Sequence, residues 1–251
     1  MRNILFASFI ALLLAGCEKQ NPQENREETE GTETGEGLFA MNDGNASVGE
    51  VENEEGSLAT EVDRLLKETG DLRDQGKYPE AKASMIRALS ILRQLEDKEH
   101  SKLIQCLKVL VDVSGEMQEN DEVLEYAGEV ANLALADEDK GFAYNRIGLA
   151  CFNKGEYDQA IEYDEKSLAI YLEAGGPDDP NVALNYNNLG LAYVQKGECD
   201  KAVGYFEKTL AIYFKILGPD HPEVATTYIN LGTVYAKKGE YEKAIGCNAK
   251  S

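Results

Sequence analysis

The chain contains no tryptophan and only two histidines among its 251 residues. Histidine is the side chain best suited to proton transfer near neutral pH and a common metal ligand, so both kinds of chemistry have few candidates. His100 ends a charged run, and the turn position of His221 is occupied by Asp179 in the segment 42 residues earlier. A metal ligand or catalytic base would not be exchanged in this way, whereas a helix-capping residue would. We therefore predict that the protein is not an enzyme and has no catalytic residues, metal ligands or cofactor.

Basic residues are also scarce, because 25 Lys and Arg accompany 46 Asp and Glu, for a net charge of −21. Nucleic-acid phosphates need Lys and Arg, so we predict no nucleic-acid partner. Anionic lipid surfaces would repel such a chain, so any attachment to a membrane should be covalent.

The cysteines lack the close spacing of metal and redox motifs, because no two of them form a C-x-x-C pair. Cys17 follows an apolar run, and the other four are widely separated: Cys106, Cys151, Cys199 and Cys247. The sequence leaves open whether these four form disulfides, and it favours free thiols packed as small apolar groups.

The first 16 residues have the pattern of a secretory signal peptide, with Arg2 followed by an apolar run, residues 4–16, broken only by Ser8. The run is too short for a membrane-spanning helix, which needs about 20 apolar residues. Its end, Leu14-Ala15-Gly16-Cys17, resembles the lipobox of bacterial lipoproteins. In that family the cysteine is acylated on sulfur, cleavage occurs just before it, and the new amine is acylated too. The alternative is a plain signal peptide followed by an incidental cysteine.

The lipobox resemblance implies a lipid anchor at Cys17 and a place on a membrane of the bacterial cell envelope, without deciding between the outer and the inner membrane. Residues 17–57 are rich in Glu, Gly, Asn and Thr and have few large apolar side chains. Such a segment cannot bury enough surface to offset the entropy of ordering it, so we predict a disordered acidic tether. Binding of a basic partner is the alternative role for this segment.

Three later segments match one another residue by residue at an offset of 42, beginning at Ala143, Asn185 and Thr227. In the middle segment the apolar residues recur at helical spacing before and after Gly197, which predicts two helices joined by a turn. Gly197 is free to adopt a positive φ there. We expect Gly190 and Ala202 to be small because the two helix backbones approach closely. Pro222 suits the first turn of the next helix.

These residues resemble the tetratricopeptide repeat (TPR), in its longer 42-residue form found in kinesin light chains. The resemblance implies an all-α fold, a superhelical solenoid of helix-turn-helix units. The expected units are a divergent repeat at 58–99, a degenerate helical pair at 100–140, full repeats at 141–182 and 183–224, and a repeat at 225–251. The last unit is incomplete, because Ser251 falls where its second helix should continue.

The first helices of such repeats line a concave groove that binds extended peptides. By resemblance, the sixth position of each unit faces this groove, and an Asn there can both donate to and accept from a ligand backbone. The residues at that position are Arg146, Asn188 and Asn230. Their neighbours on the same predicted face are Asn145, Asn187, Leu149, Leu191 and Gln195.

Together these features predict a membrane-anchored TPR scaffold that binds a peptide or helix of another envelope protein. The alternative is an assembly lipoprotein that escorts an outer-membrane protein complex. The two differ in partner, because only the second should co-purify with an integral outer-membrane protein. The oligomeric state stays open.

Overall fold

A computed structural model of the chain describes residues 48–95 and 100–251, with side chains from Ser57 onward. The predicted signal peptide, Cys17 and most of the predicted tether lie outside these residues.

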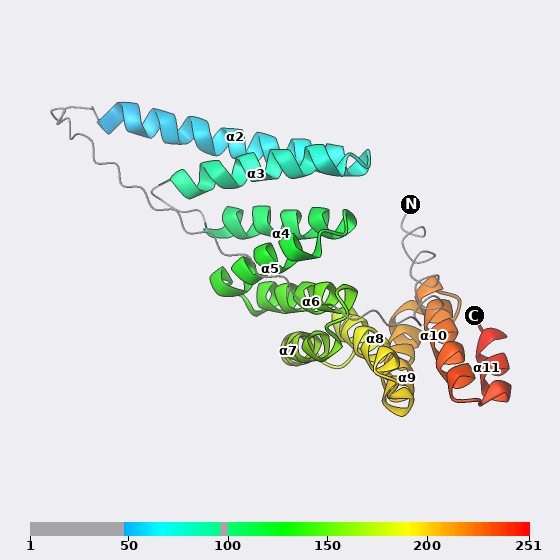
Figure 1. The fold of residues 1–251 in the computed structure, drawn as a ribbon. Helices are drawn as coiled ribbons and strands as arrows, with labels where there is room; N and C mark the ends of the chain where they lie inside the picture. The colour runs from blue at the N-terminus through cyan, green and yellow to red at the C-terminus, as the bar shows by residue number, and fades with distance from the viewer. Residues whose placement is uncertain (1–47, 96–99) are drawn as a thin grey trace, which may run out of the picture. The chain divides into compact units, whose positions relative to one another are not determined.

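The described residues form ten α-helices and no strand, shown in Figure 1. Hydrophobic residues recur at helical spacing along each helix, and Pro79, Pro180 and Pro222 stand in first turns, where the missing N–H is not needed. The helices are α2 (Val48–Asp74), α3 (Tyr78–Gln94), α4 (His100–Glu116), α5 (Asn120–Leu133), α6 (Asp137–Asn153), α7 (Tyr157–Ala174), α8 (Pro180–Gln195), α9 (Cys199–Leu217), α10 (Pro222–Lys237) and α11 (Tyr241–Asn248).

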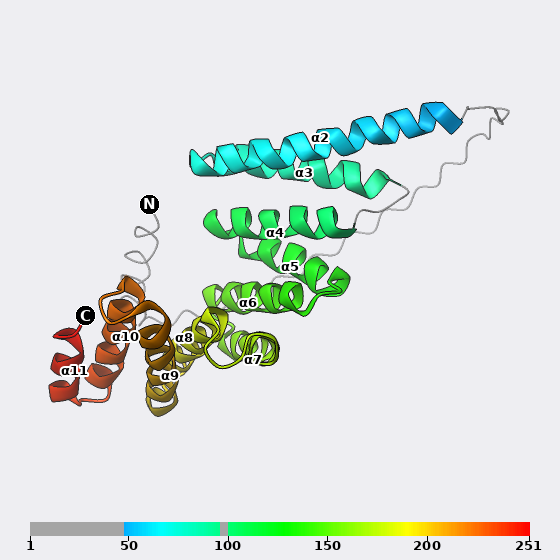
Figure 2. The ribbon, with the colours of Figure 1, turned by 180° about the vertical axis from the view of Figure 1, so that it is seen from behind.

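Each helix packs on the helix before it and the helix after it, as Figures 1 and 2 show from opposite sides. The first helices of the five pairs are α2, α4, α6, α8 and α10, and α4 and α8 also touch α6 directly. This order confirms the predicted all-α, helix-turn-helix solenoid.

The turn inside each pair has one recurring geometry, with a residue of positive φ at the second position after the first helix. In the third pair Gly155 has a φ of 81°, and its N–H and that of Glu156 donate to carbonyl oxygens at the end of α6. Gly197 has a φ of 76°, as the sequence predicts. Gln118 takes the same place after α4, with a φ of 60°.

Gln118 explains why the second pair is hard to recognise in the sequence. It stands 42 residues after Gly76 but only 37 before Gly155, and α5 has 14 residues where α7 has 18. The shorter helix breaks the 42-residue register, and a left-handed glutamine replaces the glycine. The degenerate unit is therefore a helix pair with the same turn and different spacing.

Replacing Gln118 by glycine should raise the free energy of unfolding by about 0.5–1 kcal/mol. A residue with a side chain costs about 1–2 kcal/mol in the left-handed region, and glycine avoids this cost. Because glycine loses more conformational entropy on folding, the net increase in stability is smaller than that. Urea denaturation measures the difference. The matched control is Gln105→Gly, at an exposed site inside α4, which should cost about 1 kcal/mol. Equal destabilisation by both variants would contradict the claim that the positive φ of Gln118 is unfavourable.

Side chains of the second helices pack against glycines of the first helices. A Cβ added to Gly190 would lie 2.7 Å from the Phe206 ring, and one added to Gly148 would lie 2.7 Å from Oδ1 of Asp164. The expectation that Gly190 is small because two backbones meet is thus incomplete. Gly190 makes room for an aromatic ring, and that ring is fully buried.

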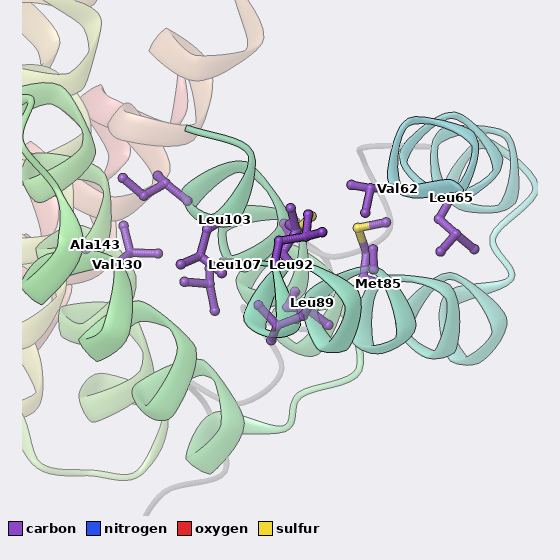
Figure 3. Close-up of a cluster of buried hydrophobic side chains, with 14 residues drawn as sticks. Val62, Leu65, Met85, Leu89, Leu92, Leu103, Leu107, Val130 and Ala143 are labelled. Atoms are coloured by element: carbon purple, nitrogen blue, oxygen red, sulfur yellow. The ribbon is translucent and has the colours of Figure 1, made fainter. Parts of the chain in front are cut away.

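One cluster of buried apolar side chains extends from the first helix pair to the start of the third. Figure 3 shows Val62 and Leu65 of α2 beside Met85 of α3, with the apolar side chains of α4 following. The same cluster reaches Val130 of α5 and Ala143 of α6. Each pair therefore depends on its neighbour for burial, as expected for repeats that expose an apolar face when isolated.

The residues that cap α8 and α10, and the four cysteines of the described part, have the roles that the sequence favours. His221 caps α10, because its Nδ1 accepts from the N–H of Glu223 at 3.2 Å, and Asp179 caps α8 through Asn181 at 2.7 Å. All four cysteines of the described part are free thiols. Cys106 is fully buried, and this burial raises its pKa to about 11.

A ladder of ion pairs joins successive pairs near their turns. The residue after each of α6, α8 and α10 is a lysine, and its Nζ reaches an aspartate in the first turn of the preceding second helix. The pairs are Lys154–Asp121 at 2.8 Å, Lys196–Asp158 at 2.6 Å and Lys238–Asp200 at 2.7 Å. The aspartates are exposed, so water and salt screen each pair. Each ion pair should therefore add little to stability.

Candidate protein-interaction face

The helix α8 carries no charged residue over its 16 positions, although 28% of the chain is charged. In α10 the charged residues stand only near the ends, at Glu223 and Lys237. One side of each helix is buried, and the other presents amides, hydroxyls and aliphatic groups. We call this second side the neutral face; it consists of Leu184, Asn187, Asn188, Leu191 and Gln195 of α8 and Thr226, Ile229, Asn230 and Thr233 of α10.

The predicted residues of α8 and α10 do come together on this face. Nδ2 of Asn230 donates to Oδ1 of Asn187 at 3.2 Å, which links the two helices. Asn188, Leu191 and Gln195 lie at helical spacing beside this pair, and all are partly exposed. The neutral face therefore offers amides whose remaining donors and acceptors can meet a polypeptide backbone.

Asn145 has a different place from the one predicted for it. Its side chain is 7% exposed, and its Nδ2 donates to Oδ1 of Asn185 at 3.3 Å. The Nδ2 of Asn185 in turn donates to the carbonyl of Asn181 at 2.8 Å. This buried chain joins α6 to α8, because a polar group removed from water needs such partners. Asn145 is thus a residue of the interhelix contact rather than of the exposed groove.

Arg146 is half-buried, and its guanidinium group contacts other side chains. Its guanidinium lies 2.9 Å from Oδ1 of Asp112 and over the ring of Phe142, and Arg73 approaches the other oxygen of Asp112 at 3.6 Å. The first helices α2, α4 and α6 are thereby connected through one carboxylate. Leu149 lies half-buried one turn after Arg146. This part of the predicted groove is charged, in contrast to the neutral face.

Asp164 of α7 is 1% exposed, and among the described residues its Oδ1 has no hydrogen-bond partner. Burial, the dominant influence, raises the pKa of Asp164 well above the ordinary value, and the side-chain amide of Asn188 opposes this rise in part. The core of this pair therefore contains an acidic group whose charged form burial disfavours.

Sequence reasoning missed Asp112, Asp164 and Asn185. Asp164 could have been noticed, because it aligns with Phe206 in the next unit and thus occupies a core position. No comparable signal marks Asp112 or Asn185, since their partners lie in other repeats.

An open hollow of about 570 Å³ runs beside α4, next to Lys108, Asp112 and Asp139. Both carboxylates are paired with cations, since Lys108 contacts Asp139 at 2.8 Å and Arg146 contacts Asp112. Within residues 48–95 and 100–251, no cluster of three or more His, Cys, Asp or Glu could hold a metal ion. Among the helices described, none is both long and apolar enough to cross a bilayer.

Residues 140–215 and 205–251 match the tetratricopeptide repeat family. No curated protein shows significant sequence similarity to the chain. Similar solved structures include BtubC (BKLC) from P. vanneervenii, with a TM-score of 0.64 and 19% identity over 78% of this chain and 87% of that one.

The TPR-like repeats assigned to a kinesin light chain of Podosopora anserina give a TM-score of 0.63 at 19% identity, over 74% of this chain and 90% of that one. The apo form of RapI gives 0.67 at 21% identity, covering 74% and 67%. At these identities the likeness concerns the fold. The family match covers the helices from residue 140 onward, and the recurring turn geometry and the structural neighbours show that the earlier described helices share the same tetratricopeptide-repeat solenoid fold.

Proposed function

We propose that the protein is a membrane-anchored TPR scaffold of the bacterial cell envelope that binds an extended segment of a partner protein on its neutral face. The observation that carries the binding part is the absence of charge from α8 in so acidic a chain. A surface that only needs to be soluble would carry charges there, as the exposed sides of α7 and α9 do. A similar structure, a Rap protein, was solved in complex with the Competence and Sporulation Factor.

Site-specific photocrosslinking in the native cell tests this proposal. A photoreactive residue in place of Leu191 should give a discrete adduct with one protein, because Leu191 lies partly exposed on the neutral face. The same residue in place of Glu207, exposed on α9, is the control and should give none. Equal labelling at both positions would point to non-specific contact and reject the neutral face as the binding surface.

The paired amides give the second test. Replacing Asn187 and Asn230 together by alanine should reduce the Leu191 adduct at least tenfold. Stability should change little, because both partners of one hydrogen bond are removed and no buried group is left unpaired. The matched control is the pair Asn153 and Asn120, also joined at 3.2 Å between successive helix pairs but away from the neutral face. Loss of the adduct in the control as well would contradict a specific role.

Anchoring rests on the lipobox-like residues Leu14 to Cys17. Replacing Cys17 by alanine should move the protein from the membrane fraction to the soluble fraction, since the acyl chains would be lost. Cys247→Ala, which removes a partly exposed thiol of the solenoid, should leave it on the membrane. Fractionation followed by immunoblotting measures both. A Cys17 variant that stays on the membrane would reject the lipid anchor.

A further inference from the structure

The helices α8 and α10 begin alike, but different chemical groups cap them. The side chain of Asp179 accepts from the N–H of Asn181 at 2.7 Å. Nδ1 of His221 accepts from the N–H of Glu223 at 3.2 Å. A carboxyl group can accept a hydrogen bond in either protonation state, whereas an imidazole ring has an acceptor only when it is neutral. Of the two caps, the cap of α10 is therefore the one that a proton can remove.

Protonation of His221 would act on the start of α10 in two ways of the same sign. Both ring nitrogens of an imidazolium carry hydrogen, so the N–H of Glu223 would lose its acceptor. The positive charge would also stand at the N-terminal end of the helix, where the helix dipole is itself positive. Histidine changes charge between about pH 5 and 8, so both effects fall in the range around neutral pH.

The charged groups around His221 do not form an ion pair with it. Its side chain is half-buried, and within the described residues it has no acidic partner. The helix α8 has no charged residue, and burial raises the pKa of Tyr213 on α9 to about 12, which keeps that phenol neutral. The other charged groups of the neighbouring segments are Asp220 and Glu223, Lys215 of α9, which is paired with Asp178, and Lys250, which lies over the Tyr228 ring. Their charges affect the pH at which the ring gains its proton, but they cannot restore an acceptor.

The turn that His221 caps carries the first residue of the neutral face on α10. Oγ1 of Thr226 donates to the carbonyl oxygen of Pro222, the first residue of the helix, at 2.9 Å. Val224 in the same turn is fully buried, in a cluster that includes Val182 of α8. Opening of this turn would therefore release Thr226 and loosen the contact between the two helices that form the neutral face.

We propose that His221 is a pH-sensitive cap that controls the neutral face: when its ring gains a proton, the first turn of α10 opens and the partner is bound less tightly. Asp179 holds the start of α8 in either case, so the response is confined to α10. The opening of the turn follows from the cap alone, whereas the effect on the partner rests on the function proposed above. The partner should be bound above about pH 7 and released below about pH 6.

Solvent-exchange NMR of the full chain in detergent micelles tests the cap without a ligand. The protection factor of the Glu223 N–H, which corrects for the intrinsic pH dependence of exchange, is compared at pH 7.5 and pH 5. It should fall about fivefold in the wild type, as expected for the loss of an N-cap. It should not fall in His221→Asp, which copies the cap of α8, and it should be low at both pH values in His221→Ala.

The N–H of Asn181 is the internal control and should keep its protection, because Asp179 caps it. An equal fall at Glu223 in the wild type and in His221→Asp would overturn the proposal. An equal fall at Asn181 and Glu223 would overturn it as well, since the effect would then not depend on the histidine.

The Leu191 adduct, formed in cells held at the same two pH values, gives the second readout. With His221 in place the adduct should be about fivefold weaker at pH 5, the ratio expected from loss of the cap, and with His221→Asp it should not depend on pH. An adduct that weakens equally in both would overturn the link between His221 and binding. Conversely, a pH-dependent Glu223 N–H without any Leu191 adduct would support the cap and reject the proposed function.

Discussion

Replacing Phe206 by alanine should lower the free energy of unfolding by about 3–5 kcal/mol, the usual cost of removing a fully buried phenylalanine. The ring is 0% exposed and lies against Gly190, which has no side chain to move into the space. The cavity cannot close from that side, so the cost should fall at the upper end of the range. Chemical denaturation followed by circular dichroism measures it.

Two comparisons make this result specific. Phe214→Ala, on the same helix but 41% exposed, should cost clearly less. Gly190→Ala should destabilise the wild type, since its Cβ would stand 2.7 Å from the ring, but it should stabilise the Phe206→Ala variant by filling part of the cavity. Additive effects of the two substitutions would contradict direct packing of the ring on Gly190.

Replacing Asp164 by asparagine should change how stability depends on pH. The folded-state pKa of Asp164 is raised, so the wild type holds this proton more tightly when folded. Its stabilising contribution is complete below the unfolded pKa of about 3.9 and is lost as pH rises through the folded pKa. The gain in unfolding free energy from Asp164→Asn should therefore grow with pH, by up to about 1.4 kcal/mol per pH unit between the two pKa values, and then level off.

Thermal or urea denaturation between pH 4 and pH 9 measures this gain. Asp158→Asn is the matched control, because Asp158 lies on the same helix with an 85% exposed side chain, paired with Lys196. It should show no rise of this kind. A pH-independent difference between Asp164→Asn and the wild type would contradict the burial of a raised-pKa carboxyl at this site.

The fold from Ala143 onward could be predicted because the same helical pattern recurs at a fixed offset. The α4–α5 pair resisted prediction because α5 is shorter and Gln118 replaces a glycine at the turn. The neutral face followed from the pattern as well, since Asn188 and Asn230 are 42 residues apart and must lie on equivalent helix faces.

The placement of Asn145 and Asp164 could not be predicted in the same way. Asn145 is buried because Asn185, 40 residues later, accepts its hydrogen bond, and Asp164 is buried because Gly148 leaves room for it. In both cases the deciding neighbour lies in another helix. A pattern along one helix separates its faces, but it does not show which polar side chain finds a partner inside.

The lysine ladder bears on how such a chain can change in length over generations. Lys154, Lys196 and Lys238 each form an ion pair with an aspartate of the preceding helix pair. This holds even for Lys154, whose partner Asp121 lies in the shorter helix α5. A unit duplicated as a whole would bring both its own lysine and its own aspartate. Gene duplication or deletion of one unit thus leaves no charge mispaired at the new junction.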